Sequence, residues 1–170
     1  MWFSAHFLGH YNMKATGNFG GELSDKTQCV VMVIYEDDAA LRRTMRACDR
    51  LVKSLWSTVD FKFHWWRTRF LADPNLAAGA AQEAEEADLF IVCSEAGAVP
   101  SSQLKCWFGD WIKRRSGRVG AVVNLTTTGS TTLPDLAPGE IFLRDVCNQA
   151  KLDFLGAFPS PEVYTESEAA

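Results

Sequence analysis

The chain has 170 residues, of which 47% are apolar and 22% charged, and its formal net charge is −4. This length and apolar content are typical of one globular domain with a real core, and they argue against wholesale disorder. The negative charge gives no support to nucleic-acid binding, and the lack of any run of about 18 apolar residues argues against a membrane span.

Strands and helices are expected to alternate along the chain. The strands are predicted at residues 29–35, 59–66, 88–93, 119–125 and 153–155, and the helices at 37–55, 73–87, 101–115 and 140–150. Apolar runs indicate the strands, and capping pairs such as Asp73-Pro74 indicate the helix starts. The predicted buried face of the first helix consists of Leu41, Met45, Cys48, Val52 and Leu55.

Strands joined by helices of this length predict right-handed crossovers and a parallel sheet. The fold class is therefore α/β, a doubly wound, five-stranded, flavodoxin-like sheet in the order 2-1-3-4-5 that lacks a normal fifth helix. Residues 28–159 are expected to form this domain. Residues 1–27 are expected to be a mobile leader, with Met1 or Met13 as the natural start, and residues 160–170 a disordered acidic tail.

Three carboxylates, Glu36, Asp37 and Asp38, follow the first strand directly. They are expected at the carboxyl end of that strand, where open α/β sheets bind ligands. Two interpretations stay open. Asp37 or Asp38 caps the following helix, or Glu36 and Asp37 hold a divalent ion such as Mg²⁺, which prefers carboxylate oxygens.

Four segments resemble the receiver domain of response regulators: VVMVIYEDDAALRRTM, ADLFIVC, VVNLTTTG and AKLDFLGAFP. The resemblance implies an acidic pair at Glu36 and Asp37 and a hydroxyl residue at Thr126. However, Cys93 stands at the position of the phosphoacceptor aspartate, and Ala157 replaces the lysine. A thiol disfavours a hard metal ion and the bound phosphoryl group loses a counter-charge, so the resemblance implies a receiver-like domain without phosphoryl chemistry.

A second stretch, ADLFIVCSEAGAVPSSQLKCWFGDWIKRR, resembles the third strand, flavin loop and following helix of flavodoxin-like NAD(P)H-dependent flavin reductases. This resemblance implies FMN, with the TTTGS segment that begins at Thr126 as a second flavin loop. The carboxylates after the first strand oppose it, because they would repel the FMN phosphate.

Aromatic side chains at the end of the second strand, Trp65 and Trp66, could stack a flat ligand or cover the sheet. The candidate ligand-binding residues are Glu36, Asp37, Cys93, Ser94, Glu95, Thr126, Thr127, Trp65 and Trp66. No catalytic residue is assigned. The five cysteines are interpreted as free and buried, which indicates a reducing, cytoplasmic location.

The leading functional prediction is a non-catalytic, receiver-like interaction or signalling domain with an unidentified protein partner and no cofactor. The alternative is an FMN-binding, NAD(P)H-dependent, flavodoxin-like oxidoreductase. Without a fifth helix, the first-helix side of the third to fifth strands should stay partly bare. Leu89, Ile91, Val122 and Phe154 are the side chains considered for that side. A bare apolar strip of this kind favours a homodimer, or a cover formed by the aromatic leader.

Overall fold

The computed structural model describes residues 26–95, 97–115, 117–126 and 137–157. Its elements in chain order are β1 (Thr27–Tyr35), α1 (Asp38–Leu55), β2 (Val59–Arg67), the short 3₁₀ helix η1 (Thr68–Ala72), α2 (Pro74–Glu85), β3 (Leu89–Ser94), α3 (Ser102–Arg114), β4 (Ala121–Thr126), α4 (Pro138–Ala150) and β5 (Asp153–Ala157). The predicted leader and acidic tail fall almost wholly outside these residues.

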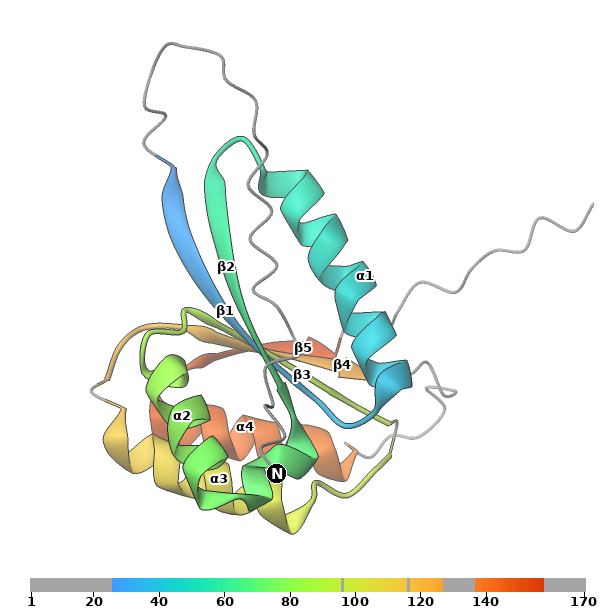
Figure 1. Cartoon of the computed structure of the whole chain (residues 1–170), viewed down its shortest axis with the longest axis vertical. Coiled ribbons are helices and arrows are strands. Elements are labelled where there is room, and N and C mark those ends of the chain that lie inside the picture. Colours follow the sequence, from blue (N-terminus) through green and yellow to red (C-terminus); the bar gives the residue numbers. More distant parts are fainter. Residues whose placement is uncertain (1–25, 96, 116, 127–136, 158–170) are drawn as a thin grey trace, which may run out of the picture.

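The five strands form one parallel sheet in the order β2-β1-β3-β4-β5, which confirms the predicted topology. Figure 1 shows α2, α3 and α4 on one side of the sheet and α1 on the other. β1 and β2 extend together beyond the other strands, alongside α1. No helix in the described ranges is both long and apolar enough to cross a bilayer.

The two faces of the sheet are covered unequally. On the side of α2–α4, Phe90 and Val122 are fully buried together with Phe108 and Trp111 of α3. On the α1 side, Leu89 of β3 and its neighbours on β4 stay half-buried. Alternate residues of a strand point to opposite faces of the sheet. The difference in burial arises because three helices cover one face, whereas α1 is the one described helix on the other.

Within the described part of the chain, no helix other than α1 covers the α1 side of β3–β5, as expected, although the residues on that side differ in part from those considered. Leu89 and Ile91 do face α1, and Ile91 is buried there. Val122 and Phe154 pack with the opposite cluster instead. Alternate residues of a strand face opposite sides of the sheet, so Leu89 and Ile91 point to one side while Val122 and Phe154 point to the other. Only the register of the strands decides which set of alternate residues faces α1.

The buried face of α1 was predicted correctly only in part, because Cys48 is buried and Leu41 packs against the same cluster, but Met45 and Leu55 do not belong to it. Ala40, Thr44 and Cys48 are buried, whereas Met45 is 47% and Leu55 39% exposed. Small side chains at i, i+4 and i+8 let the helix lie close to the sheet, which turns the larger apolar residues to its flank.

The cysteines are free, as predicted, but they are not all buried. Cys48, Cys93 and Cys147 are buried, Cys29 is half-buried and Cys106 is exposed. Cys106 lies on the outer side of α3, because Leu104, Trp107, Phe108 and Trp111 supply that helix with its buried face.

Candidate functional site

Two of the three carboxylates after β1, those of Asp37 and Asp38, are already engaged within the protein. The side chain of Asp37 accepts the N–H of Ala40 at 2.7 Å and caps α1, as one of the two open interpretations predicted. Asp38 pairs with Arg67 at the end of β2 at 3.3 Å, and the Nε of Arg67 donates to the backbone carbonyl of Glu36 at 3.2 Å. The first turn of α1 thus carries its own anions, which the helix dipole favours.

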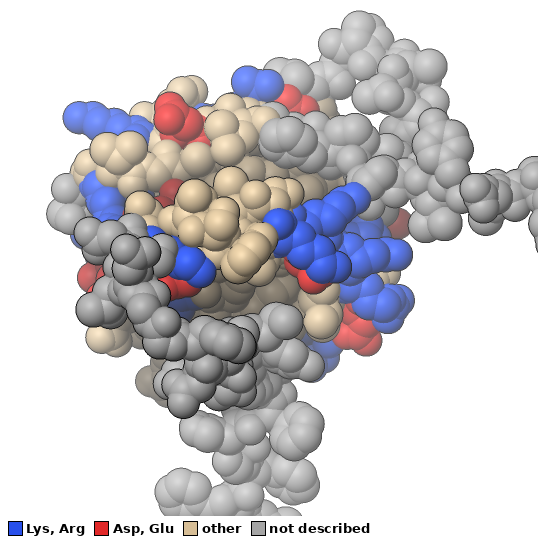
Figure 2. Space-filling view, turned by 90° about the horizontal axis from the view of Figure 1, so that it is seen from above, with Lys and Arg blue, Asp and Glu red and all other residues tan. Residues whose placement is uncertain are grey.

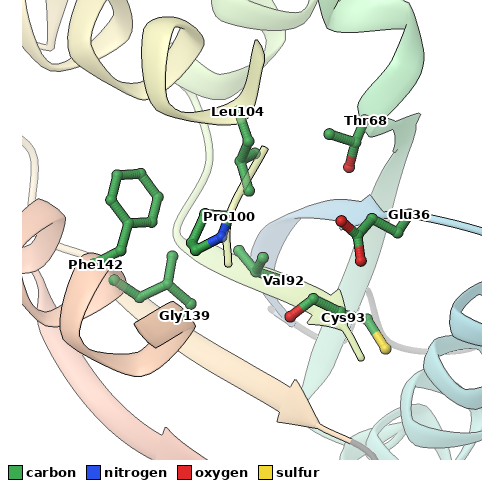
Figure 3. Close-up of a pocket in the computed structure, with 10 residues that line it drawn as sticks. Glu36, Thr68, Val92, Cys93, Pro100, Leu104, Gly139 and Phe142 are labelled. Carbon is green, nitrogen blue, oxygen red and sulfur yellow. The ribbon is translucent and has the colours of Figure 1, made fainter. Parts of the chain in front are cut away.

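A small pocket lies beside these groups at the carboxyl ends of β1 and β3 (Figure 3). Its lining consists of Glu36, Thr68, Val92, Cys93, Ser94, Pro100, Leu104, Gly139, Phe142 and Leu143. The free volume is only about 10 Å³, close to the smallest space that holds one water molecule. These residues therefore form a filled junction between the strand ends and α3 and α4.

Cys93 lies at this junction, but its thiol does not open into it. The residue is 1% exposed, and its side chain belongs to the apolar cluster on the α1 side of the sheet. In Figure 3 the sulfur points away from Val92, Pro100 and Phe142. A buried thiol among apolar neighbours behaves as a small hydrophobic group.

Two residues of this junction, Thr68 and Gly139, were not identified from the sequence. Thr68 begins η1 and is buried, and its hydroxyl donates to the carbonyl of Tyr35 at 3.2 Å. Gly139, the second residue of α4, lies close to the β3–α3 connection. A Cβ there would lie 3.5 Å from the carbonyl oxygen of Ala98 and 3.9 Å from the Oγ of Ser94. Their roles depend on contacts between residues more than 30 positions apart, which local patterns do not encode.

Two predicted residues are neighbours at the sheet edge. Ser94 and Thr126 are register partners on β3 and β4, and both are half-buried. Glu95 is exposed one residue further along. Thr127 lies outside the described residues. The strand ends therefore bring Glu36, Ser94 and Cys93 to one junction, with Thr126 next to Ser94.

The two tryptophans of β2 lie on opposite faces of the sheet and do not form one stacking platform. Trp65 faces α1, with its ring 6.0 Å from that of Phe63. Trp66 faces α2, where its indole N–H donates to Glu83 at 2.7 Å. The same carboxylate lies 2.9 Å from the Nδ1 of His64. These contacts fasten α2 to the edge strand.

The residues present do not fit the phosphate of an FMN group at the β1–α1 connection. A phosphate binds at a helix start through unoccupied N–H groups. Here Asp37 already accepts the N–H of Ala40, and Glu36 and Asp38 add two further carboxylates. Among the described residues, no group of three or more His, Cys, Asp or Glu side chains is arranged to hold a metal ion. Mg²⁺ at Glu36 and Asp37 stays a prediction.

Comparison with known proteins concerns the fold. No protein-family model matches the chain, and no curated protein sequence matches it. One similar solved structure is the metal-soaked Flv1 flavodiiron core from Synechocystis sp. PCC6803, with a TM-score of 0.52 and 12% identity over 78% of this chain. Together with the strand order, this similarity settles the architecture. The fold is flavodoxin-like.

The matched region spans 30% of the flavodiiron core's own length. A second structure is FerB, a flavoenzyme NAD(P)H:(acceptor) oxidoreductase from Paracoccus denitrificans. It has a TM-score of 0.47 and 16% identity, and the match covers 83% of this chain and 81% of that one. At 12% identity, the flavodiiron match establishes the fold and leaves the chemistry to the residues of this chain.

Proposed function

We propose that this chain is a non-catalytic, flavodoxin-like domain that acts by binding a protein partner. The observation that carries the proposal is the state of the α1 N-terminus. Its first turn is capped by Asp37, and Asp38 is paired with Arg67. The place where a related fold would bind an anion is filled by the protein's own carboxylates.

The groups needed for phosphoryl transfer are also missing from the matching positions. Phosphoryl transfer onto a protein side chain needs an oxygen nucleophile beside a hard cation. Cys93 supplies a buried thiol directed toward α1, and Ala157 supplies no cation. The receiver-like features that remain, the acidic group and Thr126, serve capping and strand pairing instead.

Flavin binding is the second candidate. Two observations favour it: the fold resembles that of the flavodiiron core, and α4 starts beside Ser94 without a side-chain cap. The carboxylates of the β1–α1 connection oppose it. Each close pair of a carboxylate and a phosphate oxygen costs roughly 1 kcal/mol or more at surface-like dielectric.

Titration of the purified full chain with FMN separates the two candidates. For an interaction domain, we expect colourless protein and no saturable quenching of FMN fluorescence in the micromolar range. Riboflavin, which has no phosphate, is the matched ligand control. Yellow protein, or saturable quenching by FMN, would overturn the proposal in favour of the flavin-dependent oxidoreductase.

Phosphoryl chemistry is tested separately with beryllofluoride and Mg²⁺, observed by amide NMR. We expect the resonances of Cys93, Ser94 and Thr126 to stay where they are in fluoride and Mg²⁺ alone. Saturable shifts that require beryllium would contradict a non-catalytic domain.

A further inference from the structure

An apolar strip remains uncovered by described helices on the α1 side of the sheet. Strand alternation and register place Leu89, Val123, Leu125 and Leu155 on this side. The first three are half-buried, and Leu155 is 49% exposed. We call these four residues the β3–β5 strip.

One flank of α1 next to this strip is basic. Asp38 pairs with Arg67, so the flank that carries Asp38 faces β2. At about 100° per residue, Arg43 and Arg50 fall on the opposite flank, toward β3–β5. Arg46 lies further out on the helix and is exposed. Figure 2 shows Lys and Arg side chains gathered in one group on the side of α1, next to uncharged residues.

Arg43 indicates what kind of group this flank accepts. Its Nε is buried, and none of the described residues offers it a hydrogen-bond acceptor. Leaving a buried guanidinium N–H without a partner is unfavourable, and a carboxylate satisfies it best. The surface thus combines an apolar strip with a guanidinium that needs an anion.

Residues 158–170 have the complementary composition. The segment reads FPSPEVYTESEAA and contains three glutamates, no lysine or arginine, and the apolar residues Phe158, Val163 and Tyr164. It follows directly after β5, which borders the strip. We propose that residues 158–170 bind across the β3–β5 strip and that their carboxylates pair with the arginine flank of α1.

The length of the segment is sufficient for this path. Strands lie about 4.8 Å apart, so the distance from β5 across to β3 is about 10 Å. The prolines at 159 and 161 favour an extended chain of about 3.1 Å per residue, which takes Glu162 about 15 Å beyond Ala157. Glu162 can therefore reach the flank that contains Arg43, with Val163 and Tyr164 near the strip.

Charge favours residues 158–170 over two other candidates for covering the same face, a second copy of the chain and residues 1–25. A second copy in the predicted homodimer would present the same apolar strip and the same arginines again. The aromatic residues of segment 1–25 would cover apolar surface, but that segment includes only two carboxylates, Glu22 and Asp25, and one lysine. Residues 158–170 supply three carboxylates and no cation.

NMR on the full chain tests the proposal. We expect nuclear Overhauser contacts from the Tyr164 ring to the methyl groups of Val123 and Leu125. Isotope-filtered spectra of mixed labelled and unlabelled chains should show that these contacts arise within one molecule. Contacts made only between molecules, or contacts to the strip from residues 1–25 in place of Tyr164, would overturn the proposal.

A charge variant tests the arginine contact in the same protein. The triple variant Glu162→Gln, Glu166→Gln and Glu168→Gln should shift the Nε–H resonance of Arg43 and weaken the Tyr164 contacts. The matched control Glu85→Gln, Glu86→Gln and Asp110→Asn changes three exposed acids, two at the C-terminal end of α2 and one on α3, and should leave both signals unchanged. An Arg43 resonance that is the same in the triple variant and in the wild type would refute the pairing.

Discussion

Asp88, at the amino ends of the strands, allows a sharp test of how the sheet is held together. Its carboxylate accepts the N–H of Val30 at 2.9 Å and pairs with Arg118 at 2.7 Å. Its backbone carbonyl accepts the N–H of Ala121 at 2.9 Å. One residue therefore connects β1, β3 and β4, and replacing its charge should weaken the two contacts that its carboxylate makes, those to Val30 and Arg118.

The pKa of Asp88 is lowered in the folded protein. Burial alone would raise the pKa, but the N–H of Val30 and the guanidinium groups of Arg118 and Arg115 outweigh it. A lowered folded-state pKa means that the carboxylate stabilises the fold above the unfolded value, here 3.8. That contribution is lost as the pH falls through the folded-state pKa.

Asp88→Asn should lower the free energy of unfolding by about 1–2 kcal/mol near neutral pH. The reduced hydrogen bond to Val30 accounts for about 1 kcal/mol, because a neutral acceptor is weaker than a carboxylate. The ion pair adds only about 0.2–1 kcal/mol, since the side chain of Asp88 is 32% exposed and that of Arg118 is 49% exposed.

Urea unfolding followed by tryptophan fluorescence, over a series from about pH 7 to about pH 2, measures this difference. The difference in the free energy of unfolding between wild type and Asp88→Asn should become smaller at the pH values where the wild-type carboxyl is protonated. Asp110→Asn, which removes an exposed ion pair with Lys113, is the control and should change stability by less than about 0.5 kcal/mol. A gap of constant size across the pH series would refute the assigned role of the Asp88 charge.

Two further predictions concern packing and thiol reactivity. Gly120→Ala should destabilise the protein by about 1–3 kcal/mol in the same assay, because the new Cβ would lie 2.8 Å from the backbone oxygen of Asp88. Gly109→Ala is the control, because a Cβ at this position of α3 would lie in open space, and it should stabilise the protein by about 0.5–1 kcal/mol. If both substitutions changed the free energy of unfolding equally, the close contact between a Cβ at position 120 and the Asp88 oxygen would be contradicted. Of the five cysteine thiols, that of Cys106 should be labelled first in the native protein, because it is exposed. Burial raises the pKa of Cys48 to about 12, so its thiol should be labelled only when the protein unfolds. Mass spectrometry of the labelled peptides measures the order, and labelling of Cys48 before Cys106 would contradict the prediction.

The sequence by itself determined the elements and their arrangement. The unbroken apolar run at Cys29–Tyr35 predicts a strand buried on both faces, and Val31 to Ile34 are indeed at most 1% exposed. Helix starts were equally readable, because Asp73 and Ser101 cap α2 and α3 through contacts within three residues. Alternation of such strands and helices leaves few topologies, since crossovers are right-handed.

Only the tertiary structure decided what the candidate residues do. The sequence left Asp37 and Asp38 as alternative caps of α1, and the fold assigns the cap to Asp37 while it brings Arg67, 29 positions after Asp38, next to Asp38. Cys93 follows a strand as a nucleophile would, yet the register of β3 turns its thiol into the α1 cluster. The burial of Thr44 in place of Met45 likewise depends on how closely α1 lies on the sheet. Periodicity and capping are local properties of the chain, whereas the partner and direction of a side chain are set by packing between distant segments.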